Sequence, residues 1–128
     1  MWFVVIGKVG TISAEVISTL NLSIIPDTPI YIGKTNIAHM LSSHPDDYVK
    51  YGSYISEIIA SPEYVGLNPK DNSIEYVKEF QVDGEFVKVA VRVSARDQYF
   101  ARSIYVLNKQ RVLNFIEKGT LKRLTPTK

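Results

Sequence analysis

The stretch "SIEYVKEFQVDGEFVKVAVRV", residues 73–93, decides the fold of this 128-residue chain. Its outer runs, residues 73–80 and 85–93, are rich in residues that favour strands, and Asp83-Gly84 between them is a strong hairpin signal. In the second run, valines occupy every other position from Val87 to Val93. Side chains alternate between the faces of a strand, so the valine face is predicted to be core, opposite Phe86, Lys88, Ala90 and Arg92.

Residues 98–107, "QYFARSIYVL", follow as a third strand after a turn near residues 95–97. Strict alternation gives this strand an apolar face of Phe100, Ile104 and Val106, interrupted by Arg102. The opposite face then carries Tyr99, Ala101, Ser103 and Tyr105. We expect the apolar face to be buried with the four valines under one apolar helical stripe, formed by Ile55, Ile58 and Ile59.

Shorter segments precede and follow these strands. Residues 2–9 and 27–33 are predicted strands, and residues 13–22 fit helical spacing with Ser13 as the N-cap. A helix over residues 35–43 is predicted to be capped by Thr35, and a second helical stretch spans residues 46–62 with a break at Gly52. Residues 66–72 are predicted to form a loop. Asn108 and Gly119 delimit a last helix over residues 109–118.

This order of elements predicts an α+β fold in a single domain over residues 1–128. We expect an antiparallel sheet, built from a three-strand meander plus the N-terminal strand, with helices on one face. The other face is left for function.

The composition is that of an ordinary globular domain, with 45% apolar and 22% charged residues. Cysteine is absent, so disulfides and thiolate metal sites are excluded and a cytoplasmic location is expected, either directly or after delivery into a target cell. The apolar run at the N-terminus is too short to span a membrane, and no membrane partner is expected.

Charge is unevenly distributed, although the net charge is only +2. Residues 1–97 carry eight basic and twelve acidic side chains, whereas residues 98–128 carry seven and one. The basic C-terminal helix and tail, residues 108–128, therefore suit a polyanion or an acidic partner protein, or form an ordinary solvated surface.

The polar faces of the two long strands are the first candidate site. If the apolar faces pack under the helices, four polar side chains lie together on the open face: Lys88, Arg92, Ser103 and Tyr105. Two cations, a hydroxyl and a phenol suit a phosphate. The alternative is a solvated sheet face that carries polar residues without a function.

The two histidines, His39 and His44, are both in "IAHMLSSHP", residues 37–45. Helical spacing places His44 on the apolar side or at the helix end, and His39 on the polar side. His39 is therefore the better candidate for proton transfer, and His44 is the supporting residue. No metal site is expected, because the histidines are not at i, i+4 and Asp46 and Asp47 are explained by the start of a helix.

Four segments carry a resemblance to a known family: "IYIGKTNIAHMLSSHPDDY" (residues 30–48), "IIASPEYVGLNPKDNSIEYVKEF" (58–80), "VAVRV" (89–93) and "RSIYVLN" (102–108). Over residues 1–116, the chain resembles the phage-associated nuclease domains of the barnase–EndoU–colicin–RelE-like superfamily. The resemblance implies a barnase/RelE-like architecture and RNA cleavage that needs no metal or other cofactor. By position, His39 matches the helix histidine of the family and Ser103 its last-strand Ser/Thr, where threonine is common; Arg92, Lys34 and Tyr105 are further candidates.

In such an endoribonuclease, the ribose 2′-OH attacks the adjacent phosphorus and leaves a 2′,3′-cyclic phosphate. His39 would serve as base or acid, Arg92 would stabilise the phosphorane, Ser103 would donate a hydrogen bond, and Tyr105 would stack on a base or relay a proton. The RNA backbone would be held by five cations: Lys34, Lys88, Arg102, Lys109 and Arg111.

RNA is therefore the expected partner, and a toxin or phage-associated role would add a cognate antitoxin or immunity protein. The alternative is a non-catalytic RNA- or protein-binding module on a degenerate nuclease fold. A small phage-encoded antitoxin or regulator is a third reading.

Overall fold

The computed structural model describes residues 5–124, with side chains from residue 7 onward, and its centre is the hairpin expected around Asp83-Gly84. Strands β4 (Ile74–Phe80) and β5 (Glu85–Val93) pair antiparallel, and Gly84 takes a φ of 65° in the turn. This left-handed conformation favours glycine. Strand β6 (Tyr99–Leu107) pairs antiparallel with β5 on its other side.

The sheet is larger than the sequence indicated. Within the described residues it has seven strands in the order β1-β2-β6-β5-β4-β3-β7, instead of the four expected. Strands β1 (Val5–Ile12) and β2 (Thr28–Gly33) form one edge, and β2 runs parallel to β6. Strands β3 (Tyr64–Leu67) and β7 (Leu121–Arg123) form the other edge. The expected loop over residues 66–72 was wrong at its start, where β3 continues to Leu67.

The helices begin and end close to the predicted residues. Helix α1 (Ala14–Leu20) is capped by Ser13, whose hydroxyl accepts from the Val16 N–H, and α5 (Lys109–Lys118) is capped by Asn108. The second helical stretch is divided into α3 (Pro45–Tyr51), a 3₁₀ turn (Gly52–Tyr54) and α4 (Ile55–Ala60). Thr35 was wrong as the cap of α2 (Lys34–Ser43): Gly33 is the N-cap, and its N–H donates to Asn36.

One side of the sheet holds the larger core. Val87, Val89, Val91 and Ile104 are fully buried there with α4 isoleucines, as expected. Val93 was a wrong prediction, since 43% of its surface is exposed near the end of β5. The predicted strand residues before Val5 lie outside the described part of the chain.

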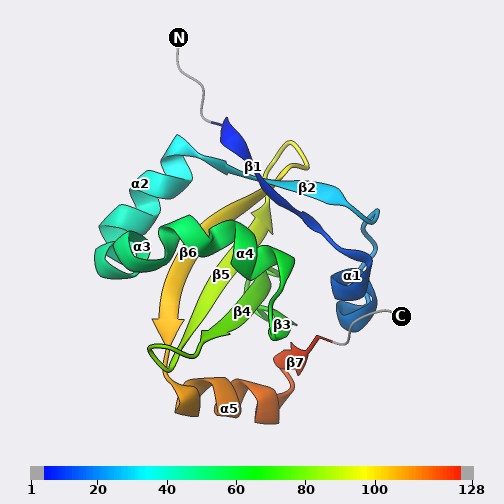
Figure 1. Ribbon diagram of the computed structural model, residues 1–128. Coiled ribbons are helices and arrows are strands. Elements are labelled where there is room, and N and C mark those ends of the chain that lie inside the picture. The colour runs from blue at the N-terminus through cyan, green and yellow to red at the C-terminus, as the bar shows by residue number, and fades with distance from the viewer. Residues whose placement is uncertain (1–4, 125–128) are drawn as a thin grey trace.

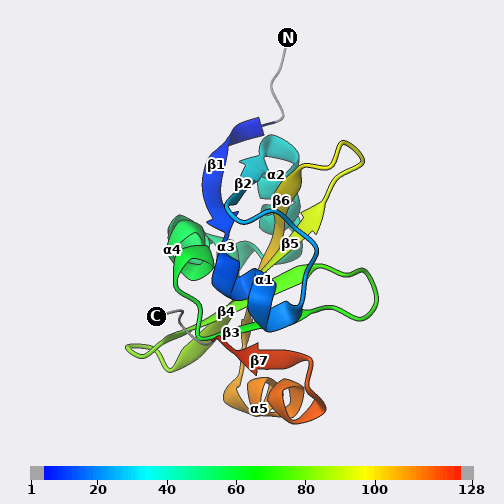
Figure 2. The ribbon, with the colours of Figure 1, turned by 90° about the vertical axis from the view of Figure 1, so that its right-hand side faces the viewer.

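The opposite side of the sheet is not left open along its whole length. Helix α5 packs there over a second core, formed by Val77, Phe86, Leu107, Val112 and Leu121. Figures 1 and 2 show α5 at the lower end of the sheet, apart from α2, α3 and α4. The expectation that all helices cover one face was therefore wrong, and only the upper part of the second face is free. None of the helices in residues 5–124 has the length and apolar character needed to cross a membrane.

Candidate active site

A β-bulge in β6 shapes the free part of the sheet. Ala90 lies opposite Ser103, but the next residue, Val91, lies opposite Ala101, so Arg102 is an extra residue in β6. A bulge of this kind shifts the alternation of side chains by one. Arg102 therefore lies on the same side of the sheet as Ser103, not in the core.

The bulge also reverses the predicted faces before it. Phe100 lies opposite Arg92 on the free face, whereas Tyr99 and Ala101 lie opposite Val93 and Val91 on the core side. Ala101 is fully buried. The expected burial of Phe100 with the valines was wrong, because strict alternation through Arg102 does not hold.

A cavity of about 200 Å³ opens on this face. A row across three strands forms its centre, with Glu75 of β4 opposite Ala90 of β5, and Ala90 opposite Ser103 of β6. The methyl group of Ala90 leaves space between its two polar neighbours. The full lining is His39, Asn68, Asp71, Ser73, Glu75, Ala90, Arg92, Arg102, Ser103 and Tyr105.

His39 reaches the cavity from α2, which packs beside β6 on the side away from β5. Its side chain is exposed, and the Ser43 hydroxyl lies 3.4 Å from Nε2. In space the order is thus β4, β5, β6 and α2 (Figure 1), so Glu75 and His39 stand on opposite walls. His39, Arg92, Ser103 and Tyr105, the four residues predicted to be catalytic, all line this one cavity.

Glu75 is a functional candidate that the sequence reasoning missed. It is 7% exposed, and its Oε2 accepts hydrogen bonds from Lys88 Nζ at 3.0 Å and Asn68 Nδ2 at 3.2 Å. Its Oε1 makes no hydrogen bond with any other residue in the described range. No local signal in the sequence pointed to it, because the loop spans four residues, 81–84, and only the resulting register, with Phe80 opposite Glu85, places Glu75 diagonally next to both Lys88 and Arg92.

Lys88 does not lie on an open surface, which corrects the prediction. It is 5% exposed, because α5 covers it, and its ammonium lies 4.5 Å from the centre of the Tyr105 ring and 5.7 Å from that of Phe115. A buried ammonium is tolerated only when it is paired, and here the carboxylate of Glu75 and the two aromatic rings supply that pairing. Lys88 therefore holds Glu75 in place.

Arg92 is positioned by Asp71, whose Oδ2 lies 3.4 Å from the guanidinium. The backbone N–H of Ser73 donates to Asp71, and this bond, together with Arg92, lowers the pKa of the Asp71 carboxyl below its ordinary value. Asp71 is therefore charged at neutral pH and competes with any phosphate for Arg92. Arg102, in contrast, makes no ion pair or hydrogen bond within residues 5–124.

His44 lies behind the cavity. Its ring stacks on Tyr105 with centroids 4.9 Å apart, and its Nδ1 lies 3.9 Å from Asp47. Asp47 in turn accepts a hydrogen bond from the backbone of Val106 in β6. This chain of contacts connects the end of α2 and the start of α3 to the strand that carries Ser103 and Tyr105.

A comparison with protein families identifies the family of this chain. Residues 7–114 match the family model described as phage-Barnase-EndoU-ColicinE5/D-RelE like nuclease3. The chain belongs to this nuclease family. The match contains every residue that lines the cavity. No curated protein and no solved structure matches the chain.

Three other predicted cations of this nuclease lie outside the cavity. Lys34 is exposed at the start of α2, and Lys109 and Arg111 are exposed on α5. Arg111 lies 5.7 Å from the Phe115 ring. Within residues 5–124, no three histidine, aspartate or glutamate side chains lie close enough together to hold a metal ion.

Proposed function

We propose that this nuclease is a metal-independent endoribonuclease that uses the ribose 2′-OH of its substrate as the nucleophile. One observation carries the proposal. Two groups able to move protons, Glu75 and His39, stand on opposite walls of a cavity that is also lined by the Ser103 hydroxyl and the guanidinium groups of Arg92 and Arg102. Transfer to a 2′,3′-cyclic phosphate needs a base and an acid on opposite sides of the phosphorus, with cations between them.

Glu75 is the base in this proposal. Its Oε2 is occupied by Lys88 and Asn68, which leaves Oε1 for the proton of the 2′-OH. The two hydrogen bonds fix the carboxylate, so the base is oriented before the substrate binds.

His39 is the acid, and it protonates the departing 5′ oxygen. Histidine suits this role, because its ordinary pKa near neutral pH lets it both hold and release a proton. Arg92 and Arg102 balance the charge of the phosphorane, and Ser103 donates to a non-bridging oxygen.

The RNA strand continues from the cavity toward α5. A further cavity of about 220 Å³ shares Asn68 and Glu75 with the first and is also lined by Phe115 and Lys118. Lys109 and Arg111 lie on the same helix, so α5 supplies cations for the backbone beyond the scissile phosphate. Lys34 would bind the RNA backbone near the start of α2.

A nuclease of this kind is harmful to its host, so we also propose a toxin or phage-associated role and a neutralising antitoxin or immunity protein as a partner. Expression of the chain alone in bacteria should arrest growth, whereas the E75Q variant should not.

The activity is tested with the purified chain and a single-stranded RNA in EDTA. We expect the RNA to be cut and DNA of the same sequence to survive. Glu75→Gln should lower the rate at least about 100-fold, as the loss of a general base does. Glu79→Gln is the matched control, because Glu79 is also on β4 but does not line the cavity.

Purified chain that binds RNA and never cuts it would contradict the proposal and favour the non-catalytic binding module. A requirement for Mg²⁺ would contradict the mechanism while leaving the fold in place.

A further inference from the structure

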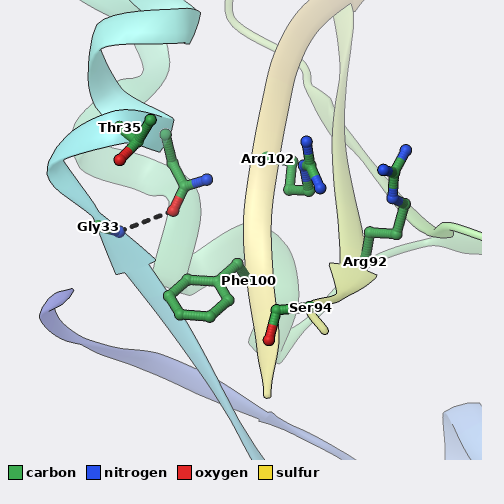
Figure 3. A pocket seen from close by; sticks show the side chains of 7 residues that line it. Gly33, Thr35, Arg92, Ser94, Phe100 and Arg102 are labelled. Carbon is green, nitrogen blue, oxygen red and sulfur yellow. Dashed lines mark hydrogen bonds between the residues drawn. The ribbon is translucent and has the colours of Figure 1, made fainter. Parts of the chain in front are cut away.

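A second cavity, of about 270 Å³, lies next to the proposed catalytic one and shares Arg92 and Arg102 with it. Figure 3 shows it between the helix that carries Thr35 and the strand that carries Arg92. A phosphate held by the two arginines would place one nucleotide in the first cavity and its neighbour in the second. The base of an adjoining nucleotide would then lie in the second cavity.

The lining provides an aromatic surface. Phe100 is half-buried, its ring tilts against Tyr31 with centroids 6.1 Å apart, and it lines the cavity because of the bulge at Arg102. Every nucleobase has a flat face that stacks on such a ring. Phe100 alone would accept all four bases.

The polar groups of the cavity are mostly donors. Asn36 Oδ1 accepts from the Gly33 N–H at 2.8 Å, as the dashed line in Figure 3 shows, and this bond fixes the orientation of the amide. The Asn36 NH₂ then makes no hydrogen bond with any described residue. Two guanidinium groups add further donors, and the lining contains no carboxylate: Gly33, Thr35, Asn36, Arg92, Ser94, Phe100 and Arg102.

We propose that this second cavity is a nucleobase subsite that prefers bases with a keto oxygen, guanine and uracil, over bases with an exocyclic amino group, adenine and cytosine. The inference rests on the proposed ribonuclease function. The keto oxygens at C6 of guanine and C4 of uracil accept hydrogen bonds, whereas the amino groups at the same positions donate them. An amino group facing Asn36 Nδ2 leaves two donors unpaired, which disfavours adenine and cytosine.

The preference is measured with oligonucleotides that contain a single cleavable ribonucleotide. The base on each side of the scissile phosphate is varied in turn through guanine, uracil, adenine and cytosine. For the nucleotide in the second cavity, kcat/KM should be at least about tenfold higher with the two keto bases.

Two variants connect the preference to the cavity. Asn36→Asp retains an oxygen for the Gly33 N–H but replaces the NH₂ with an acceptor, so the keto preference should disappear or reverse. Phe100→Leu should weaken the reaction about 5- to 100-fold for all four bases and leave their order unchanged. Asn21→Asp is the control, because Asn21 is exposed at the end of α1 and lines neither cavity.

Failure of the subsite and failure of the ribonuclease function give different results. Cleavage with equal rates for all bases at both positions, or a preference that Asn36→Asp leaves intact, overturns the subsite alone. If nothing is cut, binding of 2′-O-methyl homopolymers still tests the subsite. Tighter binding of the guanine and uracil polymers that is lost in Asn36→Asp supports it, and equal binding overturns it.

Discussion

His39 and His44 are five positions apart, yet the fold places them differently. His39 is exposed on α2 and lines the cavity, whereas His44 ends α2 and stacks on Tyr105. Helical spacing alone predicted these different positions, with His39 on the polar side of the helix and His44 on its apolar side or at its end. The partner of His39 across the cavity, Glu75, was not identified, because a glutamate in a strand of mixed character carries no signal until the strand is paired.

The separation of roles predicts opposite effects of two substitutions. His39→Ala should lower RNA cleavage at least about 100-fold and leave the urea midpoint almost unchanged, since the side chain is exposed. His44→Ala should cost about 1 kcal/mol of stability, because it removes the stacking on Tyr105 and the contact with Asp47. Cleavage assays and urea titrations on both variants decide this. Small, equal effects on cleavage would remove histidine from the mechanism.

At the scale of elements, the strands of the central hairpin were predictable and the short strands β3 and β7 were not. Alternating valines and an Asp-Gly turn determine β4 and β5 locally. Strands β3 and β7 contain only four and three residues, and they become strands by tertiary pairing: β3 lies between β4 and β7, and β7 pairs with β3. The bulge at Arg102 also has no local signal. It places Tyr99, Phe100 and Ala101 on the sheet faces opposite to those predicted.

The pairing of β3 with β7 brings the chain after α5 close to Gly66. A Cβ at this position would lie 1.9 Å from the backbone oxygen of Thr120, which cannot move away easily. Gly66→Ala should therefore destabilise the protein by about 2 kcal/mol or more. Gly7→Ala is the control, since a Cβ there meets nothing within 4 Å. Urea titrations compare the two, and equal midpoints would show that β7 does not pack on β3 as described.

At the scale of the whole molecule, α5 divides the second face of the sheet into a covered and an open part. The basic character of residues 108–128 was evident from the sequence, but it did not show that α5 packs over Phe86 and Lys88. For that reason the open face was predicted correctly at Arg92 and Ser103 and wrongly at Lys88. Tertiary packing far along the chain decided which polar residues are accessible.

A charged cluster connects α3 to the central hairpin and makes stability depend on pH. Glu85 accepts from the Tyr51 hydroxyl at 2.5 Å and from Lys50 at 2.9 Å, and these bonds lower the pKa of the Glu85 carboxyl. The stabilisation that ionised Glu85 gives the fold is fully present above the ordinary glutamate pKa. It is lost as the pH falls through the lowered pKa of Glu85. Burial, and to a smaller extent the hydrogen bond to Glu85, raise the pKa of Tyr51 to about 12. The stabilisation from the protonated Tyr51 hydroxyl is therefore lost as the pH rises toward that value.

Urea titrations between pH 2 and pH 8 measure the acid side of this dependence. The wild-type midpoint should fall below about pH 4, and Glu85→Gln should be less stable at pH 7 and change less with acid. Glu117→Gln, a substitution on α5 away from the cluster, should follow the wild type. Parallel curves for wild type and Glu85→Gln would show that the cluster does not contribute to folding.

The most direct measurement of the central claim replaces the nucleophile of the substrate. A single-stranded RNA is compared with the same strand carrying one 2′-O-methyl group at the scissile nucleotide, both in EDTA, and the product ends are determined by mass spectrometry. We expect the normal strand to be cut with a 2′,3′-cyclic phosphate or 3′-phosphate end, and the modified bond to resist. Equal cleavage of the modified bond, or products that end in a 3′-OH, would contradict catalysis by 2′-OH attack between Glu75 and His39.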